Sequence, residues 1–275
     1  MCRLVGIVAS ENTEFGTCLK GAPRSLARLS KEHPDGWGIA IFERTRASWR
    51  VHKGTACASE DTRFHEVAGQ SEGHVLVAHV RQKTVGPTRI ENTHPFERDG
   101  WLFAHNGTVK ALDAVRSTAS KARLSEIQGD TDSEVLFSHF LTRLDEAGLT
   151  KLHTEDARAA ATKVIETTAK KLRDNNVGAF NFLLSDGASC FAHRFGRSLF
   201  LLERRPNDDD LPPSRGTSSV AKIVTNWTKR RHAVLIASER ITDEAWREQP
   251  EGSFLRIDRD PVPTIVVTAA PGRAA

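Results

Sequence analysis

The stretch GDTDSEVLFSHFLTRL, residues 129–144, marks the point at which strand patterns give way to helix patterns. Thr131 with Glu134 forms a capping box that predicts the start of a helix. Its apolar residues recur at helical spacing: Leu136, Phe137, Phe140, Leu141 and Leu144. A second helix is predicted over residues 154–174, with one apolar face. The middle of the chain is therefore predicted to be a pair of helices.

Strands are predicted on both sides of this pair. Short stretches rich in Val, Ile, Phe and Trp lie at residues 4–9, 38–43, 74–80 and 100–104, and later at 177–185, 190–193, 199–202, 221–225, 233–238, 254–257 and 264–268. A doubly wound parallel fold would alternate strands and helices, so this order favours an α+β sandwich of sheets covered by helices. Residues 205–219 are the best loop candidate. No linker or internal repeat is evident, so we predict a single domain over residues 1–275.

Composition narrows the class of protein. The chain has 275 residues, 39% of them hydrophobic and 27% charged, which is typical of a folded domain and not of a disordered chain. No apolar run approaches the ~18 residues of a membrane span, so no membrane contact is predicted. The 39 basic residues are scattered among 35 acidic ones, and the densest basic clusters, at 204–205 and 229–231, are interpreted as solvated loops. No nucleic-acid partner is predicted.

The four cysteines indicate a reducing compartment. Cys2, Cys18, Cys57 and Cys190 form no Cys-x-x-Cys pair and lack the density of a disulfide scaffold. The apolar run at residues 4–9 is shorter than the core of a signal peptide. We therefore expect a cytoplasmic protein.

Cys2 has the most unusual position of any residue in the chain. Removal of Met1 would leave a thiol and a free α-amino group on one residue, and an amine of pKa about 8 can accept the thiol proton. Nucleophile and base would then come from the same amino acid, as in threonine N-terminal nucleophiles. The alternative is that Cys2 is a small apolar residue before a buried strand.

An acyl-transfer site also needs donors for the oxyanion. His105-Asn106-Gly107 directly follows the strand predicted at 100–104, where the Asn106 amide and the Gly107 N–H could converge on one oxygen. A plain Asn-Gly turn is the alternative interpretation.

Arg81 and Asp132 could together hold a free amino acid. Arg81 ends the strand predicted at 74–80, and its guanidinium suits a carboxylate. Asp132 at the helix start could hold an ammonium group. The alternatives are a surface arginine and an acidic residue that favours a first helical turn.

The alternative hypothesis for the same region is a metal site at His79, His94 and His105. The spacing of these histidines matches no common ligand motif, and no carboxylate that could serve as a third ligand is evident. We therefore predict no metal and no other cofactor.

Six motifs in one order carry a family resemblance. They are MCRLVG at residues 1–6, HPDGWGIA at 33–40, AHVR at 78–81, ENTHPF at 91–96, AHNG at 104–107 and TDSE at 131–134. The chain resembles the class-II glutamine amidotransferases, and among them the stand-alone YafJ-like branch. The likeness extends to FLLSDG at 182–187 and IASE at 236–239, and so covers nearly the whole chain.

The resemblance implies an N-terminal-nucleophile hydrolase fold, a four-layer αββα sandwich of two antiparallel sheets. It implies that Cys2 attacks the side-chain amide of glutamine, that Asn106 and Gly107 hold the oxyanion, that Arg81 binds the α-carboxylate and that Asp132 binds the α-ammonium. Thr84 and His94 fall where the family has residues lining the substrate site.

Two departures from the family bear on function. Many synthase-linked members carry an Arg-Gly-x-Asp-Ser pattern where this chain has PDGWG at 34–38. Those members also have a second domain that consumes the ammonia, for which 275 residues leave no room. The leading hypothesis is an amidohydrolase that cleaves the γ-amide of glutamine or of a γ-glutamyl compound through a Cys2 thioester. The alternatives are a glutaminase subunit that delivers ammonia to a separate synthase, and a catalytically silent amino-acid-binding protein.

Overall fold

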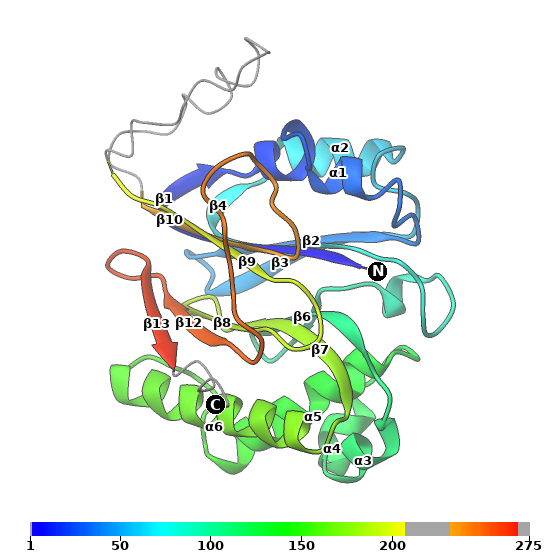
Figure 1. The fold of residues 1–275 in the computed structure, drawn as a ribbon, viewed down its shortest axis with the longest axis vertical. Coiled ribbons are helices and arrows are strands. Elements are labelled where there is room, and N and C mark those ends of the chain that lie inside the picture. Colours follow the sequence, from blue (N-terminus) through cyan, green and yellow to red (C-terminus); the bar gives the residue numbers. More distant parts are fainter. Residues whose placement is uncertain (1, 207–231, 269–275) are drawn as a thin grey trace.

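The computed structural model describes residues 2–206 and 232–268, which form two sheets and their covering helices (Figure 1). The strand predicted at 221–225, the basic cluster at 229–231 and most of the loop predicted at 205–219 lie outside the described residues. In the first sheet the strand order is β11 (Arg247–Glu248), β9 (Phe200–Arg204), β10 (Ala233–Ala237), β1 (Arg3–Glu14), β4 (Glu72–Val80), β2 (Trp37–Glu43) and β3 (Ser48–Gly54).

The second sheet has the order β13 (Thr264–Thr268), β12 (Phe254–Asp258), β8 (Ser189–His193), β7 (Gly178–Ser185), β6 (Trp101–Val109) and β5 (Phe96–Arg98). Every strand pair in both sheets is antiparallel. The helices are α1 (Leu26–Leu29), α2 (Thr62–Gly69), α3 (Leu112–Ser117), α4 (Lys121–Ser125), α5 (Asp132–Glu146) and α6 (Glu155–Asp174), with a π turn at Thr17–Gly21 and a 3₁₀ turn at Ile90–Asn92.

The two sheets pack face to face through an apolar layer. Side chains of a strand alternate between its two faces, so the even residues of β1 and β6 point into this layer. Leu4 and Val8 from β1 lie there with Leu102 and Ala104 from β6, all of them buried. This inner layer fixes the separation of the two sheets on which the site residues are carried.

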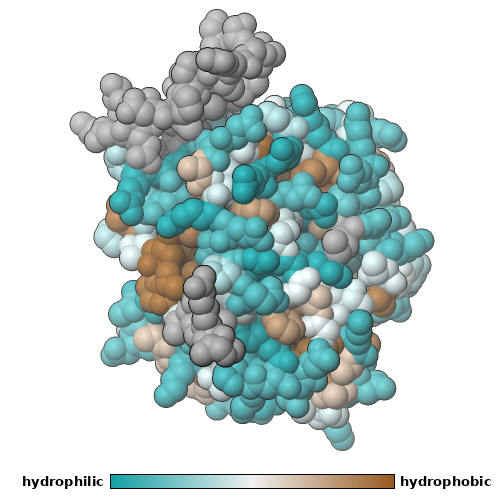
Figure 2. All heavy atoms as spheres, in the orientation of Figure 1, coloured by the Kyte–Doolittle hydropathy of each residue, from teal (hydrophilic) through white to brown (hydrophobic). Residues whose placement is uncertain are grey.

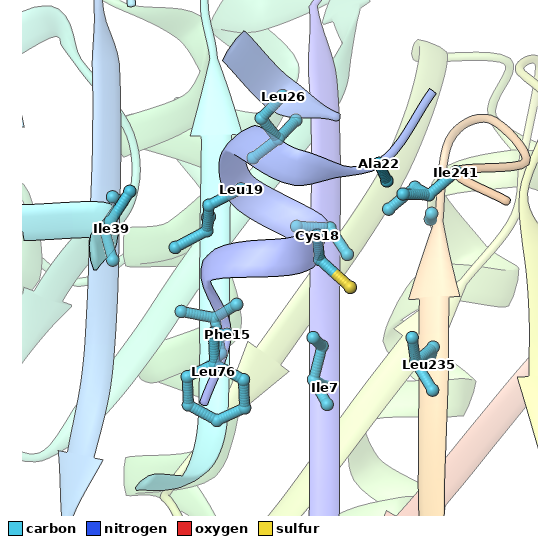
Figure 3. Packing of buried hydrophobic residues seen from close by; sticks show 14 of the residues in the cluster. Ile7, Phe15, Cys18, Leu19, Ala22, Leu26, Ile39, Leu76, Leu235 and Ile241 are labelled. Atoms are coloured by element: carbon cyan, nitrogen blue, oxygen red, sulfur yellow. The ribbon is translucent and has the colours of Figure 1, made fainter. Parts of the chain in front are cut away.

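Helices cover the outer face of each sheet, which completes the predicted four layers. The π turn, α1 and α2 lie over the first sheet, where Cys18, Leu19 and Leu26 pack above Ile7 and Leu235 (Figure 3). Helices α5 and α6 lie under the second sheet, with a core of its own that contains four stacked or tilted phenylalanine rings: Phe103, Phe137, Phe140 and Phe182. The predicted αββα sandwich of two antiparallel sheets is therefore confirmed.

The long predicted elements are found, with two corrections. The strand predicted at 100–104 continues through Gly107 to Val109, because β6 keeps pairing with β7 up to Gly178. The capping box at the start of α5 is half formed: the Thr131 hydroxyl accepts from the Glu134 N–H at 3.4 Å. The Glu134 carboxylate binds Arg98 and the N–H groups of Gln128 and Gly129 instead.

The shorter elements were not predicted. The β3 sequence SWRVHKG shows no regular alternation of apolar residues, because it is an edge strand with two exposed side chains. Helix α2 buries only Phe64 and Ala68, too few to give a helical period. On the face shown in Figure 2 most side chains are hydrophilic, and an apolar patch lies near the edge strand β13, where Val267 and the preceding Val262 are exposed.

Candidate active site

At one end of the sandwich the inner layer changes from apolar to polar. Cys2 precedes β1 on the inward face that Leu4 also occupies, and Asn106 follows Ala104 on the inward face of β6. His79 and Arg81 continue the inward row of Val77 on β4. Because β4 pairs directly with β1, through Arg3 opposite Val80, these residues are brought together across a distance of about 80 positions in sequence.

Contacts with the residues that end β10 hold the strand that carries Cys2. The Leu4 N–H donates to the Ser238 hydroxyl at 3.0 Å, and the Ser238 N–H donates to the Leu4 carbonyl at 3.1 Å. Arg3 forms an ion pair with Glu239 and donates to the Cys2 carbonyl at 3.2 Å. The start of β1 is thereby fixed to the end of β10.

The Cys2 thiol lies against the backbone of Gln82. Its Sγ accepts from the Gln82 N–H at 3.3 Å and donates to the Gln82 carbonyl at 3.4 Å. Burial raises the pKa of the Cys2 thiol, although the Gln82 backbone and the charge of Arg81 act in the opposite direction. The resting sulfur is therefore a protonated thiol, which needs a base before it can attack a carbonyl carbon.

The Gly107 N–H faces away from β7. Gly107 is paired with Phe180, whose own N–H donates to Phe195 and thus points away from β6. In an antiparallel ladder, both residues of a pair without mutual hydrogen bonds turn their N–H groups away from each other. The Gly107 N–H therefore points to the side of β6 on which β5 lies. Strand β5 spans only Phe96–Arg98 and pairs with residues 101–103 of β6, so it does not reach Gly107. Two residues further on, the Val109 N–H has the same direction and donates to Asp132 at 2.7 Å.

Asn106 presents its amide beside this N–H group. The side chain is buried on the inward face, and within the described ranges it makes no hydrogen bond to another residue. An uncommitted carboxamide next to an outward N–H is the arrangement that an oxyanion requires. The alternative interpretation of Asn106 and Gly107 as a plain turn does not hold, since both residues belong to a continuous strand.

Asp132 is the first residue of α5 and is buried. One carboxylate oxygen accepts from the Val109 N–H, and the other lies 3.4 Å from the Ser133 hydroxyl. The Ser133 hydroxyl in turn contacts Nδ1 of His105 at 2.8 Å. These contacts fix the carboxylate beside β6 and close to Gly107.

Arg81 is already engaged by the loop that follows it. Its guanidinium donates to the carbonyls of Val85 at 2.8 Å, Pro87 at 3.0 Å and Gly86 at 3.3 Å. A carboxylate acceptor would therefore have to replace some of these carbonyls. The Asp35 carboxylate in the PDGWG segment accepts a hydrogen bond from the Lys83 N–H at 2.8 Å, so that segment also contacts the loop that follows Arg81.

A small cavity joins most of the predicted site residues. It has a volume of about 20 Å³, enough for about one water molecule. The lining residues are Cys2, Arg81, Gln82, Thr84, Val85, His94, His105, Gly107, Thr131, Asp132 and Ser133. Of the predicted site residues only Asn106 is not among them, although it adjoins Gly107.

Sequence reasoning missed several of these lining residues. Gln82 and Val85 contribute backbone groups, which no residue pattern reveals. Ser133 was visible as part of TDSE, but its contact with His105 depends on how α5 packs on β6. The nearest signal was the position of these residues beside Arg81 and Asp132.

The alternative hypothesis of a metal site requires several ligand side chains close together. Within residues 2–206 and 232–268, no three His, Cys, Asp or Glu side chains are grouped so that they could hold a metal ion. Over the same residues, no helix is long and apolar enough to cross a membrane.

Comparisons with known proteins agree on one family. The family model for class-II glutamine amidotransferases matches residues 1–271. The YafJ protein of Escherichia coli is 28% identical over 219 residues, which cover 75% of this chain and 78% of YafJ. The gamma-glutamyl-hercynylcysteine sulfoxide hydrolase of Mycobacterium tuberculosis is 30% identical over 185 residues, which cover 64% of this chain and 69% of the hydrolase.

The fold is shared with a solved structure. The glutamine phosphoribosylpyrophosphate amidotransferase of B. subtilis superposes with a TM-score of 0.62 and 18% sequence identity. The match covers 96% of this chain and 49% of that enzyme. The likeness thus concerns the sandwich alone and extends over about half of the larger protein.

Proposed function

Because the chain belongs to the class-II glutamine amidotransferases, we propose that it is an amidohydrolase that cleaves the γ-amide of a γ-glutamyl compound through a thioester on Cys2. The observation that carries the proposal is the cavity in which Cys2, Gly107, Arg81 and Asp132 meet. The M. tuberculosis relative, named as a γ-glutamyl hydrolase, supports hydrolysis of a substituted amide.

The proposed reaction begins with removal of Met1. The α-amino group of Cys2 then takes the thiol proton, which is needed because burial raises the thiol pKa. The sulfur attacks the γ-carbonyl carbon, and the charge that develops on its oxygen is held by the Asn106 amide and the Gly107 N–H. The C–N bond breaks as the protonated amine of Cys2 returns its proton to the leaving nitrogen. Water then adds to the thioester, releases glutamate and restores the thiol.

Substrate recognition in this proposal uses the two charged residues. Asp132 would accept hydrogen bonds from the substrate ammonium, and Arg81 would bind the carboxylate once the carbonyls of Val85 and Gly86 move away from its guanidinium. The cavity of about 20 Å³ is too small for a glutamyl group, so the same loop movement would also make space for the substrate.

The test is a screen of γ-glutamyl amides with glutamine included, combined with intact-mass measurement. We expect a protein that lacks Met1, glutamate release, and a covalent adduct at Cys2 with a glutamine-analogue electrophile. Cys2→Ala should abolish both the adduct and turnover. Cys57→Ala is the matched control, because Cys57 is also a partly buried free thiol and does not line the cavity.

Each alternative has its own outcome in this screen. Activity on glutamine that appears only with a partner protein would indicate a glutaminase subunit serving a separate synthase. Glutamine binding without any adduct at Cys2 would indicate a binding protein. Full activity in Cys2→Ala, or a mature protein that keeps Met1, would overturn the proposed mechanism.

A further inference from the structure

Two buried histidines stand at the edge of the cavity, and neither has a role in the reaction steps described above. His79 comes from the inward face of β4, and His94 comes from the segment before β5. Their ring centroids are 4.4 Å apart, at an interplanar angle of 37°. His94 lines the cavity and His79 lies behind it. The two rings therefore form a tilted pair, and its member that lines the cavity, His94, faces the space next to Cys2.

All four ring nitrogens of this pair are buried without a hydrogen-bond partner among the described residues. The His105 backbone lies near His79 but outside hydrogen-bonding geometry. An unsatisfied buried polar group destabilises the fold, so four of them in one place are a considerable loss of stability. For His94, which lines the cavity, such a loss is expected where a bound molecule satisfies the ring nitrogens.

Both rings are uncharged at neutral pH. Burial, together with the neighbouring His105, lowers the pKa of His79 to about 3, and burial together with His79 and Lys53 lowers the pKa of His94 well below its usual value. A neutral imidazole has one N–H donor and one nitrogen acceptor. The His94 ring therefore matches a small neutral group that has both N–H donors and a lone pair.

The other buried side chains around the cavity are already committed. His105 contacts Ser133, Asp132 accepts from Val109, and Arg81 donates to three carbonyls. Thr84 is exposed. His94 is the buried lining side chain whose polar atoms all lack a partner among the described residues.

A bound γ-amide places three demands on this cavity. Its oxygen would be held by Asn106 and Gly107, and its α-substituents by Arg81 and Asp132. The nitrogen that leaves is the remaining polar atom of the substrate, and His94 is the buried polar side chain of the lining that still lacks a partner among the described residues. We propose that His94, positioned by the neighbouring ring of His79, forms the subsite that binds the leaving nitrogen of the scissile amide.

This inference rests on the proposed amidohydrolase function. In the step concerned, the C–N bond breaks, the nitrogen takes the proton carried by the Cys2 amine, and the carbonyl carbon stays bonded to Sγ. A ring nitrogen of His94 accepts a hydrogen bond from an N–H of the departing ammonia or amine, and His94 transfers no proton itself. It is thus a binding residue for the nitrogen, and His79 is a positioning residue.

The test compares two substrates that share one acyl group. Glutamine releases ammonia, whereas glutamate γ-methyl ester releases methanol, which has no N–H, and both pass through the same thioester. The value of kcat/KM reports the steps up to formation of that thioester. The variants are His94→Phe, His94→Gln and His79→Phe. The matched control is His193→Phe, because His193 is also buried with one unpartnered ring nitrogen and does not line the cavity.

We expect His94→Phe to lower kcat/KM for glutamine by about 10- to 100-fold, the loss of one hydrogen bond at the reacting group, and to leave the ester within about 2-fold. His94→Gln should recover part of the loss, and His79→Phe should show a smaller loss of the same selectivity. Because unsatisfied nitrogens are removed, Tm should stay level or rise in both Phe variants. His193→Phe should leave the ratio of the two substrates unchanged.

Equal losses on amide and ester, or an unchanged rate on glutamine in His94→Phe, would overturn the leaving-nitrogen subsite. Failure of the proposed function gives a different result: the unmodified protein would then hydrolyse neither substrate and form no adduct at Cys2.

Discussion

A methyl group at position 107 provides a sharp test of the oxyanion site. In Gly107→Ala the added Cβ would lie 1.9 Å from the Ala179 carbonyl oxygen and 2.6 Å from its carbonyl carbon. Contacts shorter than 3.0 Å are essentially never found for a Cβ, so the two backbones must separate by about 1.1 Å. These two atoms belong to the backbone of β7 and cannot rotate away, and Nε2 of His105 lies 2.7 Å from the same Cβ.

The magnitude of the effect follows from this displacement. Overpacking costs about 1–3 kcal/mol, and loss of a ladder hydrogen bond between β6 and β7 adds about 1 kcal/mol, so we expect destabilisation by about 2–4 kcal/mol. The same shift moves the Gly107 N–H by about 1 Å from the oxyanion, which predicts a loss of about 100- to 1,000-fold in kcat.

The assay combines urea unfolding with hydrolysis of a γ-glutamyl amide and mass detection of the Cys2 adduct. Gly100→Ala is the control, because Gly100 directly precedes the strand that contains Gly107, but no atom lies within 4 Å of its added Cβ. That control should lose about 1–2 kcal/mol through its positive φ and keep its rate. Unchanged stability and turnover in Gly107→Ala would refute the packing and the role given to this N–H.

Three further predictions concern single side chains. Asn106→Ala should lower kcat by about 100- to 1,000-fold while Tm stays nearly constant, because its amide has no hydrogen bond to lose within the described residues; a rate near that of the unmodified protein would contradict its role. Glu134→Ala should destabilise the fold by about 1.5–3 kcal/mol in urea unfolding, because the half-buried guanidinium of Arg98 loses its carboxylate partner and keeps its bond to the Ser138 hydroxyl; a loss below about 0.5 kcal/mol would contradict this. Burial lowers the pKa of His193 to about 3 from 6.5, so the unfolded chain alone takes up this proton as pH falls from 6.5 toward 3. His193 should therefore reduce stability by about 1.4 kcal/mol per pH unit across that window, and His193→Phe should flatten the measured pH dependence by that slope.

Periodicity and capping were sufficient to predict the long elements. Helix α5 begins where Thr131 caps it, and α6 runs over the predicted range, because these signals depend on residues within one or two turns. The interpretation failed where a neighbouring strand decides the conformation. Asn106 and Gly107 have the composition of a turn, yet β7 continues to pair with them and keeps them extended.

The candidate site was predictable in its residues more than in its contacts. Cys2 was identified by its unusual position and Asp132 by its chemistry at a helix start, and both line the cavity. That the Arg81 guanidinium binds Val85 and Pro87 could not be foreseen, since backbone carbonyls carry no sequence signal. The contact between the His79 and His94 rings likewise depends on segments that meet only in the folded chain.

The place of β1 in the first sheet also sets the order in which the protein becomes functional. Gly6 is paired with Val77 on one side and with Ile236 on the other, so the two loops that these pairings close are about 70 and 230 residues long. Contacts so far apart in sequence form late, because the entropy of loop closure must be overcome before they stabilise the chain. On the ribosome, β1 therefore has an open edge until β10 has been synthesised. Only then does Ser238 bind Leu4 and fix the start of β1 from its second side. A partly synthesised chain can thus place Cys2 against Gln82 through β4, but gains this second support only when Ser238, near the end of the sequence, has been made.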